Sequence, residues 1–375
     1  MKKKLNLLIV EDSKSEIKSY LDNVKLFNEQ EEIEIIPHVK ENKEDGFAAL
    51  SNSFYDAAIV DLKLQPSGLV FNGNQIIKEI KDKLRFPVFV ITSNPGEIDS
   101  ELKEENIFYR VFPRGAIPFI DILGEIKKIF NTGITNILGR KGTIEDYLHS
   151  IFWGHLSNSL DPWLTNNDEN SLLRYVLSHL KEYLELDEKG MFQNYNPEEV
   201  YIKPIIKQFP YTGHIIKCKA DSNYYIILSP PCDLAQKKTK DILIAFIEKL
   251  DIDEVSREIK KYSTEYPKDP KPEQFEHVYK QKADAKSKLN DLISNRGHKY
   301  HYLPVTNLFR GGFINFQKLT SISAKDIIDF YEPEVSITDN FCKDIINRFS
   351  FYYSRQGQPD MDKGLLFSNL IDSFN

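Results

Sequence analysis

The chain has 375 residues, of which 41% are hydrophobic and 28% are charged. This balance is typical of a globular protein and excludes a disordered one, and the length favours two domains, with a third possible. A formal net charge of −7 provides no general attraction to nucleic acid, so we expect no nucleic-acid partner.

The first third of the chain alternates short apolar runs with amphipathic helical patterns, which is typical of β-α-β units and a parallel sheet. We expect five strands, at Leu5–Val10, Ile33–His38, Ala57–Asp61, Pro87–Thr92 and Phe108–Phe112. Apolar residues at helical spacing predict four helices, at Lys14–Asn28, Lys43–Ser51, Gly73–Lys83 and Ile120–Phe130. Residues 1–131 are therefore predicted to form a small doubly wound α/β domain.

Glycines near residues 133–142 interrupt this pattern, and two helices are predicted after them, at Ile144–Leu160 and Ser171–Leu186. Residues 132–200 are expected to form a helical connector. From Tyr201 the pattern changes to extended segments, so residues 201–375 are predicted to form a β-rich α+β domain. Its expected strands are Gly213–Lys219, Tyr224–Ser229, Asp241–Lys249, Lys299–Val305 and Gly312–Ser323.

A charged insert, residues 251–296, interrupts the predicted β-rich domain and carries a polar helix at Pro272–Ser294. A closing amphipathic helix is expected at Asp339–Tyr353. On one short segment in which a strand meets a Ser-Pro turn, this region resembles small SH3-like barrels of the toxin-nuclease type. That resemblance implies a barrel-like fold and does not by itself imply nuclease activity.

Three carboxylates are predicted to meet at one edge of the parallel sheet. The first strand ends in Val10-Glu11-Asp12, and the third ends in Asp61. In open parallel sheets, ligands bind outside the carboxyl ends of the strands, near the point where the strand order reverses. Because such close negative charges repel one another, we expect a cation to share the site. Oxygen ligands alone favour Mg²⁺, held by Glu11, Asp12 and Asp61.

The position of Asp61 also suits a nucleophile that accepts a phosphoryl group, since aspartyl phosphates are established covalent intermediates. Such a reaction needs a hydroxyl on a phosphoryl oxygen, and the end of the fourth strand supplies Thr92, with Ser93 beside it. It also needs a cation on another oxygen. The stretch FYRVFPRG offers Arg114 or, as the less favoured alternative, Arg110.

These residues resemble the receiver domain of two-component response regulators. The resemblance covers residues 1–131 and is carried by LLIVEDS, by YDAAIVDLKL followed by Pro66 and Gly73, and by PVFVITSN. It implies a flavodoxin-like fold in which Glu11 and Asp12 bind Mg²⁺. It also implies that a histidine kinase phosphorylates Asp61 and that Thr92 is the switch hydroxyl.

Two positions depart from the pattern of that family. By its spacing from Thr92, Arg114 stands where the family has a lysine, which keeps the charge but changes the shape of the donor. Val111 stands where the family usually has its switch aromatic residue. Phosphorylation of Asp61 is the favoured interpretation, and a degenerate receiver that works without phosphate is the alternative.

The stretch YYIILSPPCDLAQ presents Cys232 and Asp233 after two prolines. One interpretation is a nucleophile or metal site completed by His214, His298 or His301. The favoured interpretation is a tight turn in which Cys232 is a small buried hydrophobic residue and Asp233 caps the following turn. No ligand pair has a usable spacing, which favours the second interpretation.

The function suggested by the receiver resemblance is signalling, with a histidine kinase as the partner. The C-terminal region carries no basic recognition helix and no helix-turn-helix pattern, which argues against a transcription factor. In domain order the chain resembles the inhibitory response regulators of Detocs-type anti-phage systems, which implies a phosphate sink and, as a further partner, a second response regulator or effector. No enzymatic activity beyond phosphoryl acceptance and autodephosphorylation is expected on this hypothesis.

Two other functions stay open at this point. In the first, the C-terminal domain is a nuclease-like effector enzyme that is gated by the receiver and centred on Cys232 and Asp233. In the second, the chain is a scaffold whose receiver only forms a homodimer. The cysteines, Cys218, Cys232 and Cys342, contain no CxxC pair and suggest neither disulfides nor a zinc site. The basic start is interrupted by acids before it can form a signal peptide, and no run approaches the roughly 20 apolar residues of a membrane span. We therefore expect a cytoplasmic protein without a membrane partner.

Overall fold

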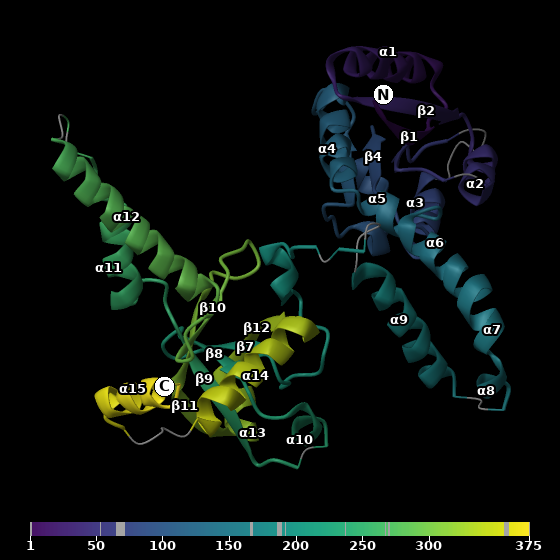
Figure 1. Cartoon of the computed structure of the whole chain (residues 1–375). Coiled ribbons are helices and arrows are strands. Elements are labelled where there is room, and N and C mark those ends of the chain that lie inside the picture. Colours follow the sequence, from purple (N-terminus) through teal and green to yellow (C-terminus); the bar gives the residue numbers. More distant parts are fainter. Residues whose placement is uncertain are drawn as a thin grey trace. The chain divides into compact units, whose positions relative to one another are not determined.

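The computed structural model describes residues 2–52, 54–64, 72–165, 168–185, 190–191, 193–236, 238–266, 268, 271–355 and 360–374. Pro66, one of the residues behind the receiver resemblance, lies outside the described residues. The chain divides into two compact units, Met1–Gln193 and Asn194–Asn375, each of which is described by itself (Figure 1). Among the helices described, none has the length and apolar character needed to cross a bilayer.

A five-stranded parallel sheet forms the centre of the N-terminal unit, in the order β2-β1-β3-β4-β5. This is the flavodoxin-like order of doubly wound sheets, so the predicted receiver-like α/β fold is confirmed. The predicted strands lie within two residues of the observed ends. The strands are β1 (Lys3–Val10), β2 (Ile33–Lys40), β3 (Ala57–Val60), β4 (Val88–Thr92) and β5 (Tyr109–Pro113).

Two pairs of helices cover the two faces of this sheet and enclose its core. On one face, Tyr20, Val24 and Phe27 of the first helix pack with the fourth helix and the odd-numbered residues of β1. On the other face, the second and third helices pack with Leu8 and Val10 of β1 and with residues of β3, β4 and β5. The helices are α1 (Lys14–Gln30), α4 (Phe119–Asn131), α2 (Lys43–Asn52) and α3 (Gly73–Lys83). Between β4 and β5 lie only two 3₁₀ turns, Pro95–Glu97 and Ser100–Leu102.

A helical hairpin follows the sheet within the same unit, where two helices are predicted. Figure 1 shows its first arm, α6 and α7, running beside the second arm, α9, with α8 at the tip. Between the arms, Tyr147 stacks on Tyr183, whose hydroxyl lies 2.8 Å from His155 Nε2. The elements are α5 (Ile134–Leu138), α6 (Thr143–Ser150), a π-helical turn (Ile151–Leu156), α7 (Ser157–Ser159), α8 (Asp161–Leu164) and α9 (Glu169–Glu185).

A seven-stranded antiparallel sheet forms the C-terminal unit, in the order β10-β11-β9-β8-β7-β12-β6. The prediction of a β-rich domain is confirmed. Within the described residues the sheet has two edges, β10 and β6, and no pairing joins them into the barrel that the SH3 resemblance implies. The strands are β6 (Tyr201–Ile202), β7 (His214–Cys218), β8 (Tyr224–Ile227), β9 (Asp241–Glu248), β10 (Tyr300–Leu303), β11 (Gly312–Ser323) and β12 (Tyr331–Ile337).

The two faces of this sheet carry cores of different size. One face supports the larger cluster, which includes Ile215, Phe316 and Val335 and is covered by the helix that contributes Ile345. The other face supports five buried residues, among them Ile216 and Ile327. The helices are α10 (Pro231–Ala235), α13 (Ala324–Phe330), α14 (Asp339–Ser354) and α15 (Lys363–Asp372), and the charged insert forms α11 (Asp253–Tyr262) and α12 (Pro272–Ile293).

Candidate functional site

The register of two neighbouring strands brings the acids of the N-terminal unit together. Val10 of β1 pairs with Val60 of β3, so the residues that follow them, Glu11 and Asp61, leave the sheet at the same level. The Asp61 N–H donates to the Val10 carbonyl at 2.9 Å. The strand register therefore places an acid from each strand at the carboxyl edge of the sheet, with Asp12 next along the chain.

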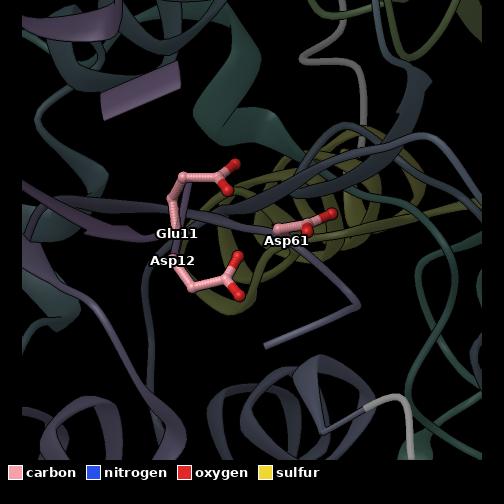
Figure 2. Close-up of side chains that lie close together, drawn as sticks. All are labelled: Glu11, Asp12 and Asp61. Carbon is pink, nitrogen blue, oxygen red and sulfur yellow. The ribbon is translucent and has the colours of Figure 1, made fainter. Parts of the chain in front are cut away.

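Glu11, Asp12 and Asp61 form a compact acidic cluster. One ligand oxygen from each carboxylate lies within 4.8 Å of the others. Figure 2 shows the three side chains gathered at one place, with Glu11 and Asp12 following one another and Asp61 beside them. The expected convergence of these side chains is thus present in the structure. A single cation would be able to contact all three.

Burial makes the negative charges of this cluster costly. Glu11 is 2% exposed and Asp61 is 7% exposed. Burial raises the pKa of Glu11 to about 7, although a hydrogen bond from the Ser13 N–H opposes the shift. Burial also raises the pKa of Asp61, against the lowering effects of Arg114 and of a hydrogen bond from the Thr92 hydroxyl. Both acids therefore need a compensating positive charge in order to ionise fully at neutral pH.

Arg114 supplies part of that compensation. It follows β5, and its Nη2 lies 2.8 Å from Glu11 Oε2 and 3.4 Å from Asp61 Oδ1. Burial lowers the pKa of Arg114 while Glu11 and Asp61 raise it, and the net pKa is raised, so the guanidinium stays charged. Arg110, the alternative considered from the sequence, pairs instead with Glu125 at 3.6 Å. Among the described residues, Arg114 is the cation recorded against both Glu11 and Asp61.

Thr92 closes the site from the end of β4. Its side chain is buried, and its Oγ1 accepts a hydrogen bond from the Asn94 N–H at 3.2 Å. Its carbonyl accepts from the Arg114 N–H at 2.8 Å, which ties the ends of β4 and β5 together. Val111, at the predicted position of the switch aromatic, instead packs against the core on the α2 and α3 side of the sheet.

Glu16 and Tyr20 also shape the site and were not singled out from the sequence, whereas Gly73, which shapes it too, was among the residues behind the receiver resemblance. Glu16 of α1 lies 3.4 Å from Arg114 Nη1, and the buried Tyr20 hydroxyl has no hydrogen-bond partner among the described residues. Their i, i+4 spacing on α1 is a signal that they share a face. Gly73 approaches the backbone of the acceptor so closely that a Cβ would lie 2.1 Å from the Asp61 carbonyl oxygen.

The donor set of this cluster fits Mg²⁺. The three ligand groups are all carboxylates, the ligands that hard divalent ions prefer. Asp61 Oδ1 is buried and has no hydrogen-bond partner among the described residues, with Arg114 Nη2 at 3.4 Å as the nearest recorded cation. An acceptor in that state is expected to have a strong partner, and a bound ion would provide one.

The C-terminal candidates are not brought together in the same way. Cys232 is exposed and lies 3.5 Å from Asp233 Oδ1, so the expectation of a buried Cys232 is wrong. It is the second residue of the short helix α10, which begins at Pro231 after the N-cap Pro230 and has no buried residue. His214 and His301 are buried in the sheet. Among the described residues, no group of three metal-ligating side chains forms in this unit.

Comparisons with known proteins identify similar folds for the N-terminal third. The chain is similar to a CheY-like receiver domain from Methylobacillus flagellatus, with 16% identity, a TM-score of 0.27, and coverage of 33% of this chain and 98% of that one. It is also similar to the receiver domain of a sensor histidine kinase from Pseudomonas aeruginosa, solved with magnesium in the active site cleft, with 14% identity, a TM-score of 0.27, and coverage of 34% and 98%.

A third similar structure is the receiver domain of a putative Luxo repressor protein from Vibrio parahaemolyticus, with 18% identity, a TM-score of 0.27, and coverage of 35% of this chain and 97% of that one. No family model matches the sequence, and no curated protein matches it. The fold assignment of the N-terminal unit rests on its own strand order, β2-β1-β3-β4-β5.

Proposed function

We propose that Asp61 accepts a phosphoryl group from a phosphohistidine of a partner histidine kinase, with Mg²⁺ held by Glu11, Asp12 and Asp61. The observation that carries this proposal is the cluster of three carboxylates within 4.8 Å at the carboxyl ends of β1 and β3. A buried Asp61 oxygen without a hydrogen-bond partner among the described residues supports it further, because that oxygen is available to attack phosphorus.

The reaction balances without any other reactant. The bond from phosphorus to the histidine nitrogen breaks, a bond from phosphorus to an Asp61 carboxylate oxygen forms, and the nitrogen keeps the electron pair. Bound Mg²⁺ would supply charge neutralisation for the carboxylate and for the phosphoryl oxygens. The protein's own contribution is to hold Asp61 fixed through the Val10 carbonyl and to exclude bulk water by burial.

Two side chains are positioned to receive the new phosphoryl group. The Thr92 hydroxyl lies at the end of the neighbouring strand, and its side chain acts to lower the pKa of Asp61. Arg114, 3.4 Å from Asp61 Oδ1, would move its contacts from Glu11 and Asp61 to a phosphoryl oxygen. Its release from Glu11 links the chemistry at Asp61 to the connection after β5 and is our proposed first step of signalling.

For the whole chain we propose the role of a phosphate sink in a bacterial two-component system of antiviral defence. The support is the resemblance in domain order noted above and the lack of a predicted DNA-binding helix in the C-terminal region. In such a role, the phosphoryl group is transferred from a kinase to Asp61, and the aspartyl phosphate is then hydrolysed. A second response regulator that competes for the same kinase would be the partner that the sink restrains.

The direct test is to incubate the full chain with acetyl phosphate and Mg²⁺ and to measure its intact mass. We expect one added phosphoryl group on the wild type and none on Asp61→Asn. The exposed Asp22 of α1 offers a matched control, and Asp22→Asn should be modified as the wild type is. An unmodified wild type, or equal modification of Asp61→Asn, would overturn the proposal.

A second arm of this test separates acceptance of phosphate from binding of the ion. Chelation of Mg²⁺ should abolish the modification, and Thr92→Ala should slow it by at least about tenfold while leaving Mg²⁺ affinity unchanged. If Thr92→Ala were modified at the wild-type rate, the hydroxyl would have no part in the transfer and the family's switch mechanism would not apply to this chain.

A further inference from the structure

The face of the C-terminal sheet that carries the smaller core contains a cavity of about 820 Å³. Ile242 of β9, which belongs to the smaller core of the sheet, forms its floor. Its walls come from the connection between β6 and β7, from α10 and from α13. This volume lies within the range of pockets that hold small molecules, roughly 300–1,000 Å³.

The inside of this cavity is mainly apolar. Phe209 and Tyr211 contribute two aromatic rings from the connection between β6 and β7, and Leu234 and Ile328 contribute aliphatic side chains from the two helices. Phe209 and Leu234 are partly buried against the core, whereas Ile328 is 55% exposed. An exposed isoleucine at the edge of a hollow apolar surface is expected to gain free energy when a ligand covers it.

The charged residues that line the cavity are of one sign. Lys207 and Lys325 are in its lining, no aspartate or glutamate is, and neither lysine forms a salt bridge with a described residue. Three other cavities in the described part of the chain are lined by acids as well as bases, including Glu105, Glu145 and Glu248. Within the described residues, this cavity therefore differs from those three in attracting anions without a competing acid.

The wall that carries the aromatic rings is supported from behind by a buried polar group. The His214 ring is fully buried and parallel to that of Phe209, with centroids 6.0 Å apart, and it lies 6.1 Å from the ring of Tyr211. Lys207 Nζ lies 4.6 Å from the centroid of Tyr211, and both residues line the cavity. The aromatic rings and one of the two cations are thus parts of a single packed unit.

We propose that this cavity binds a small organic anion that carries an aromatic group. The aromatic group would occupy the apolar space beside Phe209 and Tyr211, and the anionic group would meet Lys207 and Lys325. The proposal is independent of phosphoryl transfer at Asp61. It gives the C-terminal unit a ligand-binding role that none of the sequence motifs indicates.

The test uses anilinonaphthalene sulfonate, a fluorescent aromatic anion, titrated into the full chain and into the double variant Lys207→Glu/Lys325→Glu. We expect a saturable site on the wild type and a loss of affinity of at least about tenfold in the variant. Both lysines are exposed, so the variant is expected to fold. The matched control is Lys280→Glu/Lys286→Glu on α12, which makes the same change of net charge on exposed residues and should bind as the wild type does.

Two more measurements identify where and why the probe binds. The neutral parent compound, anilinonaphthalene, should not distinguish the variants, whereas Lys207→Arg/Lys325→Arg should retain binding of the sulfonate. If the double charge reversal binds the sulfonate as tightly as the wild type, or if the control on α12 weakens binding equally, the proposal is overturned. Binding at other apolar surfaces is recognised because it is the same in every variant.

Discussion

The acidic cluster of the N-terminal unit and the buried histidines of the C-terminal unit are opposite cases of burial. In the N-terminal unit, Glu11 and Asp61 lie beside each other and beside Arg114 at the end of the sheet. In the C-terminal unit, His214 and His301 lie inside the sheet, where both ring nitrogens of the first and Nδ1 of the second have no hydrogen-bond partner among the described residues. Clustered buried charges indicate a site, whereas scattered buried histidines contribute mainly to packing.

The same physical cause, burial, acts with opposite sign on the two kinds of group. It raises the pKa of Glu11 to about 7, because the charged carboxylate is disfavoured. It lowers the pKa of His301 to about 4, because the charged imidazolium is disfavoured. We therefore expect acid to stabilise the N-terminal unit relative to neutral pH and to destabilise the C-terminal unit.

The largest expected effect concerns the backbone that holds the acceptor. Gly73→Ala would place a Cβ 2.1 Å from the Asp61 carbonyl oxygen, so the chain around Asp61 must shift. We expect a loss of about 3 kcal/mol in the unfolding free energy of the N-terminal unit and weaker Mg²⁺ binding. Hydrogen exchange read by mass spectrometry measures each unit separately.

The control for this variant is Gly124→Ala in α4, where a Cβ meets nothing within 4 Å. It should stabilise the same unit by up to about 1 kcal/mol, since alanine is the better helix former. An equal, small effect of both substitutions would show that the close approach of α3 to Asp61 is not a constraint on the site.

The next effect is the loss of stability of the C-terminal unit in acid. Between about pH 6.5 and pH 4, the unfolded chain protonates His301 while the folded unit does not, so stability is lost as the pH falls. We expect this residue to account for about 2–3 kcal/mol of that loss. His301→Gln should reduce the pH dependence of unfolding of the C-terminal unit, to which His214 also contributes, whereas His298→Gln, at an exposed position, should leave it unchanged. Equal slopes in the two variants would remove His301 as the cause.

The N-terminal unit should respond in the other direction. Between pH 4.5 and about pH 7, the folded unit keeps a proton on Glu11 that the unfolded chain releases, so stability falls as the pH rises. We expect a contribution of about 1–2 kcal/mol in the absence of a divalent ion, and Glu11→Gln should abolish it. The control is Glu29→Gln at an exposed position of α1. Loss of stability on acidification of this unit would contradict the contrast between the units.

The smallest effect tests whether Arg114 competes with the ion for the same acids. Removal of its charge in Arg114→Ala should tighten Mg²⁺ binding by about tenfold, equivalent to about 1.4 kcal/mol, whereas Arg114→Lys should bind like the wild type. Arg110→Ala, which removes the pair with Glu125 and the contact with the Phe112 ring but no recorded contact with the three acids, is the control. Calorimetric titration measures the Mg²⁺ affinity of each variant. Weaker Mg²⁺ binding in Arg114→Ala would mean that Arg114 organises the acids rather than competing for them.

The parts of the fold that sequence reasoning located are those in which one periodic signal decides the structure. The apolar runs of β1 and β3 predict a parallel sheet, and the sheet edge then brings Glu11 and Asp61 together. The contribution of Glu16 depends instead on how α1 is placed over that edge. No local pattern in the sequence encodes that placement, so this residue becomes visible only in three dimensions.

The strand β12 shows why one element had no sequence signal. It contains Glu332, Pro333 and Glu334, and a proline inside a run argues against a strand. In the structure the register with β7 shifts between Pro333 and Val335, which is a bulge that accommodates the missing N–H. A search for alternating apolar and polar residues does not detect a strand that is interrupted in this way.

The unequal lengths of the C-terminal strands bear on how the protein behaves at high concentration. The two edges of the sheet, β6 and β10, have two and four residues, whereas the internal β11 has twelve. The strand β10 pairs only with Gly312–Asn315 of β11, so along Leu319–Ser323 the strand β11 has β9 as its one partner among the described strands. The short edge strands therefore protect only part of this sheet from pairing with a neighbouring chain.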